Sequence, residues 1–180
     1  MRRFAMFALA LAVIGASACD DDSPNDPSVQ PLVFTAVLNS QNEVTATTPN
    51  GIANPSEAAG TGTVTISMQL QRDSSGNVTG GGTANFQFVL TGFPNGTVVQ
   101  AAHIHTGAAG IAGAVRVNTG LTPGTAVTLA NGSATINATD ATVNAADAQA
   151  IVANPAAWYF NVHTTLNPAG VVRGQLVRVQ

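Results

Sequence analysis

The sequence predicts an all-β protein, built as an antiparallel β-sandwich with one short helix near residues 144–153. Short runs in which apolar and polar residues alternate recur along the chain, as expected for strands with one buried face. Turn-forming clusters separate these runs, and no strand–helix–strand rhythm is present. Charged residues make up only 8% of the 180 residues, and the abundance of Gly, Thr, Val and Asn suits short strands and turns.

The first strands are the clearest. Residues 33–39 (VFTAVLN) form a β-rich run after Pro31. Residues 60–71 alternate strictly, and residues 80–93 repeat the pattern after a turn cluster at residues 73–77. These two runs predict an antiparallel hairpin. Its inward-facing residues are expected to be Val64, Ile66, Met68 and Leu70 on the first strand, with Phe86, Phe88 and Leu90 on the second.

The second half of the chain contains further strand candidates, interrupted by one helical segment. Asn144 is an N-cap residue by type, Asp147 is favourable in a first helical turn, and Asn154-Pro155 ends the helix. We expect this helix to lie across one end of the sandwich. The strand candidates are 98–106, 114–120, 126–136, 157–164 and 171–179.

The N-terminal segment has the features of an export signal. Arg2 and Arg3 precede an apolar run at residues 4–14, which is too short to span a bilayer as a mature helix. Small residues then lead to Cys19, the only cysteine, in a pattern that resembles the bacterial lipobox. We therefore expect a signal peptide at residues 1–18 and a lipidated Cys19.

An acidic stretch rich in Pro and Ser, residues 19–32, reads as a flexible tether between the lipid and a folded domain at residues 33–180. This predicts a protein of the bacterial cell envelope that is anchored to the inner or the outer membrane. The alternative is ordinary secretion, with cleavage after Ala18 and a free thiol on Cys19.

Composition and motifs argue against two classes of function. The net charge is −3, lysine is absent and the six arginines are scattered, so the clustered cations that nucleic-acid binding requires are missing. The sequence has no Gly-x-Ser-x-Gly nucleophile motif and no paired carboxylates at catalytic spacing. We therefore expect a protein that is not an enzyme and does not bind nucleic acid.

Three histidines are the strongest candidates for a site. His103 and His105 are two residues apart in a strand candidate, so both imidazoles face one side while Ile104 faces the other. Cu and Zn sites on β-scaffolds use this spacing, and His163 is the natural third ligand. Three imidazoles around one Cu or Zn ion are expected to place their ligating nitrogens about 3–4 Å apart, because each lies about 2.0–2.1 Å from the ion.

Two other interpretations of these histidines stay open. The imidazoles can have a structural role, donating hydrogen bonds to backbone carbonyls at strand ends, or they can contact an unrelated ligand. A weak internal repeat also surrounds them, because each histidine strand is followed by a glycine-containing loop and an arginine. The repeat predicts two neighbouring hairpins that carry Arg116 and Arg173, and coincidence in a chain rich in Gly and Val is the alternative.

Arg173 lies inside a strand candidate of a charge-poor domain and is expected to need an acidic partner. Glu43 is the best candidate, and Glu57 is the second. We expect the Glu43–Arg173 pair to be a structural ion pair that joins the first strand to the last.

Three stretches of the chain carry a family resemblance. FTAVLNSQNEV, AAHIHTGAAGIAGAVRV and WYFNVHTTLNPAGVVRGQL together resemble the CHRD domain, a module named after chordin, over residues 33–178. The chain departs from the family pattern at Val44-Thr45 and at Val171. The resemblance implies an immunoglobulin-like or superoxide-dismutase-like β-sandwich and implies no established biochemical activity.

The predicted function is therefore that of an extracytoplasmic, membrane-tethered and non-enzymatic binding module. Its low charge and Thr/Asn-rich surface suit an envelope protein or a glycan as partner. The alternative is a Cu- or Zn-binding protein that uses His103, His105 and His163, with a redox or metal-handling role.

Overall fold

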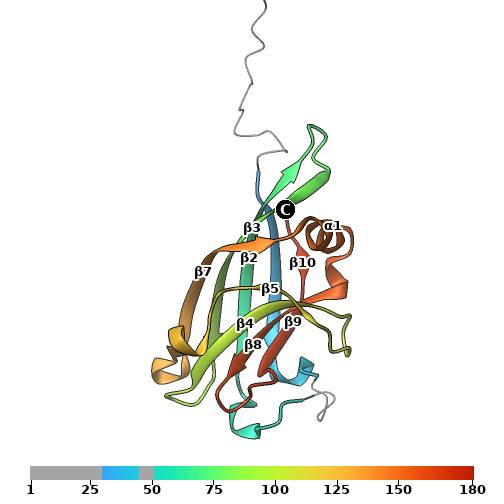
Figure 1. The fold of residues 1–180 in the computed structure, drawn as a ribbon. Helices are drawn as coiled ribbons and strands as arrows, with labels where there is room; N and C mark the ends of the chain where they lie inside the picture. The colour runs from blue at the N-terminus through green and yellow to red at the C-terminus, as the bar shows by residue number, and fades with distance from the viewer. Residues whose placement is uncertain (1–29, 45–50) are drawn as a thin grey trace, which may run out of the picture.

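The computed structural model describes residues 30–44 and 51–180. The predicted signal peptide and Cys19 lie outside the described residues, as does most of the tether. The fold is all-β and antiparallel with one short α-helix, which confirms the predicted class (Figure 1).

The strands form one continuous sheet in the order β5-β4-β8-β9-β1-β2-β3-β7. Strand β1 (Leu32–Asn39), β2 (Thr61–Arg72), β3 (Val78–Thr91) and β7 (Ala134–Val143) form one layer. The other layer contains β4 (Val98–Thr106), β5 (Val115–Asn118), β8 (Trp158–Thr164) and β9 (Val172–Gln175). Two short strands complete the sheet, since β6 (Val127–Thr128) pairs with β4 and β10 (Val177–Arg178) pairs with β1.

The two layers are joined at a narrow corner. The β1–β9 ladder contains a single residue pair, Asn39 with Arg173, whereas β1 and β2 pair along the whole length of β1. The sheet therefore folds over at β9 and β1, so that the two layers face each other in a nearly closed, barrel-like sandwich (Figure 1). The ladder runs unbroken from one layer to the other instead of forming two separate sheets.

The predicted hairpin of β2 and β3 supplies much of the core. The register places Val64 opposite Phe88 and Ile66 opposite Phe86, and all four side chains are buried. From the other layer Phe160 packs against both phenylalanines, with ring centroids 5.7 Å from Phe86 and 5.3 Å from Phe88. The alternation in the sequence therefore points to the correct face of both strands, because successive strand residues point to opposite sides.

The predicted helix is α1 (Ala145–Ala153). Its N-cap is Asn144, whose side-chain oxygen accepts a hydrogen bond from the backbone N–H of Asp147 at 2.9 Å. The helix lies at one end of the sandwich, next to β3 (Figure 1). Among the described residues, no helix has the length and apolar character that a membrane span requires.

Strand β8 departs from the alternating pattern, because all seven of its residues are buried. One face, with Phe160 and Val162, points into the sandwich core. The opposite face carries Tyr159, Asn161 and His163, and these side chains are also buried. The structure thus contains a second buried layer outside the sandwich, and this layer is polar.

Candidate metal centre

The polar layer is assembled by the pairing of β8 with β4 and β9. In the β4–β8 ladder, His103 pairs with Asn161 and His105 pairs with Tyr159. In the β8–β9 ladder, Asn161 pairs in turn with Arg173. Because paired residues in a sheet project to the same side, these residues form one contiguous polar surface on the outer face of the layer.

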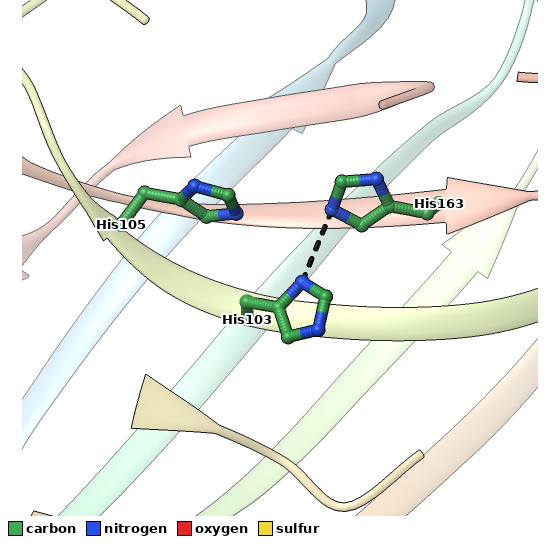
Figure 2. A group of neighbouring side chains, drawn as sticks. All are labelled: His103, His105 and His163. Atoms are coloured by element: carbon green, nitrogen blue, oxygen red, sulfur yellow. Dashed lines mark hydrogen bonds between the residues drawn. The ribbon is translucent and has the colours of Figure 1, made fainter. Parts of the chain in front are cut away.

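The three histidines come together on this surface. His103 and His105 lie on β4, His163 lies on the neighbouring β8, and their rings surround a common space (Figure 2). The nearest pair is His103 Nδ1 and His163 Nε2, at 3.2 Å. The pairing of β4 with β8 also places the two histidine hairpins side by side, as the weak repeat predicts.

One potential ligand atom from each histidine lies within 4.8 Å of the other two. This upper limit is wider than the 3–4 Å expected for three nitrogens around one Cu or Zn ion. A side-chain movement of about 1 Å would bring the set to ligand spacing, and His103 is the least buried of the three and so the freest to move.

Two of the imidazoles are held by backbone carbonyls. His105 Nδ1 lies 3.0 Å from the carbonyl oxygen of Gly113, and His163 Nδ1 lies 3.1 Å from that of Pro168. A carbonyl oxygen only accepts hydrogen bonds, so both Nδ1 atoms carry the proton and both Nε2 atoms have a lone pair. The lone pair of His163 Nε2 accepts a hydrogen bond from His103 Nδ1. The structural interpretation and the metal interpretation are therefore compatible, because metal-bound histidines commonly donate their second N–H in this way.

The electrostatic environment keeps the imidazoles neutral at pH 7. Burial, reinforced by the neighbouring imidazoles, lowers the pKa of His103 and the pKa of His163 from 6.5 to about 4, although the bond of His163 to the Pro168 carbonyl opposes the shift of its pKa. Burial also lowers the pKa of His105, an effect that its bond to Gly113 opposes and the charge of Arg173 reinforces. Neutral imidazole is the form that binds metal ions. His105 Nε2 is buried, and within residues 30–44 and 51–180 it has no hydrogen-bond partner.

A glycine makes one of these carbonyl contacts possible. A Cβ atom at Gly113 would collide with the backbone carbonyl of Thr106, so only glycine fits where the β4–β5 connection passes over the strand. The close passage of this connection brings the Gly113 carbonyl within hydrogen-bond distance of His105 Nδ1.

Next to the histidines, three side chains form a stack. The Tyr159 ring lies parallel to the His105 ring, with centroids 4.8 Å apart and planes 11° apart. On Tyr159, Arg173 places its Cζ atom 3.4 Å from the ring centroid, a cation–π contact. Arg173 is only 1% exposed, and it donates hydrogen bonds to the Ala108 carbonyl and to Gln175 Oε1.

Glu43 lies in the same layer, but it does not form the expected direct ion pair with Arg173. The only ion pair within 4.0 Å among the described residues joins Arg116 to Asp147, at 2.7 Å. Glu43 Oε1 instead accepts hydrogen bonds from the Val44 backbone N–H and from Asn161 Nδ2, and Glu43 and Arg173 interact only at longer range. Burial raises the pKa of Glu43 from 4.5 to about 7, although these hydrogen bonds and Arg173 oppose the rise.

Glu57, the second candidate partner of Arg173, has a different role that the sequence does not indicate. It is fully buried, and its Oε2 accepts hydrogen bonds from Thr164 Oγ1 at 2.6 Å and Asn167 Nδ2 at 2.7 Å. These contacts hold the turn that follows His163 and ends at Pro168, whose carbonyl orients the imidazole. A glutamate that precedes the turn by over 100 residues gives no local signal of this contact.

Comparisons with known proteins identify the domain. No curated protein and no solved structure gives a significant match. The family model described as the CHRD domain matches residues 34–176, which is most of the chain and includes the three histidines, Glu43 and Arg173. The chain therefore belongs to the CHRD domain family.

Proposed function

We propose that this CHRD-domain protein acts outside the cytoplasm as a binding protein that holds one transition-metal ion on His103, His105 and His163. One observation carries the proposal. The buried His105 Nε2 has no hydrogen-bond partner among the described residues and shares the space between the rings with His163 Nε2, while both Nδ1 atoms are anchored to carbonyls. An unsatisfied buried nitrogen is costly, and a metal ion at this position would satisfy it.

The donor set favours Cu or Zn. Imidazole nitrogen suits Cu, Zn, Ni and Fe, whereas Ca²⁺ and Mg²⁺ prefer oxygen ligands. Three protein ligands leave a coordination position open for water or a small ligand. The partly exposed His103 marks the side from which such a ligand would reach the ion.

Metal analysis tests the proposal. The chain is produced without a histidine tag and with Cys19→Ser, so that neither a tag nor a thiol competes for metal. It is stripped with chelator, loaded with Zn(II) or with copper, desalted and measured by mass spectrometry. We expect about one equivalent of metal in this protein and almost none in the His103→Ala/His105→Ala variant, because a single remaining imidazole binds weakly.

A control variant, Gln87→Ala, changes an exposed residue on β3 and should retain the full equivalent. The proposed function would be refuted if the His103→Ala/His105→Ala variant bound one equivalent of metal, or if the protein with all three histidines bound none.

We further propose that the mature protein is tethered to the cell envelope through a lipid on Cys19, which supports the same extracytoplasmic role. The support is the basic and apolar segment before Cys19 and the acidic, Pro-rich stretch after it. An envelope protein or glycan partner for the tethered domain stays a prediction.

Substitution of Cys19 tests the tether. In a bacterial host, the unmodified chain should partition into the detergent phase of a phase-separation assay, and Cys19→Ser should move it to the aqueous phase. Asp22→Asn, three residues beyond the cysteine, should leave the partitioning unchanged. An aqueous-phase distribution for the unmodified chain would contradict lipidation and would favour ordinary secretion.

A further inference from the structure

We infer from the geometry that the three-histidine site selects the monovalent ion Cu(I) over divalent ions, because the guanidinium of Arg173 is fixed beside it and has no ion-pair partner among the described residues. This inference rests on the metal-binding function proposed above and names the ion.

The ligand set of the proposed site carries no charge of its own. The only cluster of potential metal ligands found among the described residues consists of three imidazoles, with no carboxylate or thiolate. Neutral ligands leave the full charge of the ion uncompensated, and His105 and His163 are only 6% and 8% exposed. The cost of removing an ion from water grows steeply with its charge, so a buried neutral donor set favours a monovalent ion.

Arg173 holds a positive charge beside this neutral ligand set. Its guanidinium lies on the Tyr159 ring, and that ring lies on the ligand His105, so the stack fixes a cation close to the ion position. The two acceptors of its Nη2 hydrogen bonds, the Ala108 carbonyl and the Gln175 amide, are both neutral. Its Nη1 is buried and has no hydrogen-bond partner in the part of the chain that the structure describes.

Glu43 is the acidic side chain that interacts with Arg173 by charge. Glu43 lies beyond ion-pair distance from Arg173 and is engaged by Val44 and Asn161. Glu43 therefore offsets the positive charge of the Arg173 guanidinium only in part. A fixed cation repels a divalent ion twice as strongly as a monovalent one at the same position, so the residual charge of Arg173 adds to the preference for Cu(I).

The test compares two ions in matched variants. Cu(I) affinity is measured without oxygen by competition with bicinchoninate, and Zn(II) affinity is measured by competition with a fluorescent indicator. Arg173→Met removes the charge and keeps an unbranched chain over Tyr159, whereas Arg173→Lys keeps the charge and loses the planar fork.

For charges about 10 Å apart at an effective dielectric constant of about 20, Coulomb's law predicts roughly a tenfold change in affinity per unit of ion charge. Arg173→Met should therefore raise Zn(II) affinity about 100-fold and Cu(I) affinity about tenfold, while Arg173→Lys leaves their ratio unchanged. The midpoint potential of bound copper should fall by about 59 mV for this tenfold change in the ratio of Cu(II) to Cu(I) affinity.

Glu43→Gln provides a second, nearly isosteric variant in case Arg173→Met does not fold. Measured at pH 8, it should lower Zn(II) affinity by a larger factor than Cu(I) affinity, because it removes the partial counter-charge. Equal factors for the two ions in both Arg173→Met and Glu43→Gln would overturn the inference, leaving Arg173 a merely structural role. Failure of the unmodified protein to bind either ion would instead overturn the metal-binding function itself.

Discussion

Replacing His163 with alanine is expected to lower the affinity of the protein for Cu or Zn by at least a hundredfold. The binding free energy of structural zinc sites, roughly 10–16 kcal/mol for four ligands, corresponds to about 3 kcal/mol for each ligand. His163 is buried and its ring is held by the Pro168 carbonyl, so it meets an ion with little loss of side-chain entropy. Replacing His163 therefore removes a ligand that is already held in position for the ion, and the loss in metal affinity is correspondingly large.

The three histidines should not contribute equally to the affinity for the metal ion. His105 is buried and held by the Gly113 carbonyl, and its replacement should cost about as much as that of His163. His103 is more exposed, so its replacement should cost less. Competition titrations of the three alanine variants measure this order, and circular dichroism checks that each variant is folded. Undiminished affinity in the His163→Ala variant would exclude the proposed ligand set.

The second large effect is expected in the pH dependence of folding without metal. Burial holds the pKa of His103 and of His163 at about 4 in the folded protein, compared with about 6.5 when exposed. Between these values the unfolded chain binds more protons than the folded one, so acidification favours unfolding. The histidine contribution to stability is fully present above pH 6.5 and is lost as the pH falls to about 4.

The size of this loss is several kcal/mol. For His163, the difference between a pKa of 6.5 and one of about 4 corresponds to roughly 3 kcal/mol, and His103 acts in the same direction. Glu43 acts in the opposite direction. Because its pKa is raised to about 7 in the folded protein, the folded chain binds more protons at this group than the unfolded chain between pH 7 and 4.5, and acidification there favours folding. Glu43 therefore masks part of the histidine effect over that range.

Urea unfolding of the metal-free protein at several pH values measures the sum of the histidine and Glu43 contributions to the free energy of unfolding. The free energy of unfolding should fall from pH 6.5 to 4, and the Glu43→Gln variant should show a steeper fall because the opposing contribution is absent. His163→Gln should flatten the curve, since one titrating imidazole is lost. A free energy of unfolding that stays constant over this range in the Glu43→Gln variant, where the opposing contribution is absent, would show that the imidazoles are not buried as neutral groups.

The sequence predicts the local features of the fold well. The alternation in residues 60–71 and 80–93 identifies both strands of the hairpin and the inward face of each, because the side-chain period of a strand is a property of its own backbone. The N-cap at Asn144 is predictable for the same reason, since its hydrogen bond reaches only three residues along the chain.

Contacts between residues that lie far apart in the sequence are not predicted by such local patterns. The sequence suggests that Arg173 pairs with Glu43, but the folded chain places Arg173 over Tyr159 and hydrogen-bonds Glu43 to Asn161. Acid and base types indicate only which groups attract each other. The actual contacts depend on strand register and on which loop covers the outer face of β8, and neither is encoded in a short window of sequence.

The histidine cluster combines both kinds of information. The spacing of His103 and His105 ensures that their imidazoles share one face of β4, because residues two apart in a strand point the same way. That His163 joins them depends on the pairing of β4 with β8, which brings together residues about 60 positions apart. The burial of the site and the cation beside it likewise depend on strand order and loop packing, which are properties of the whole folded chain.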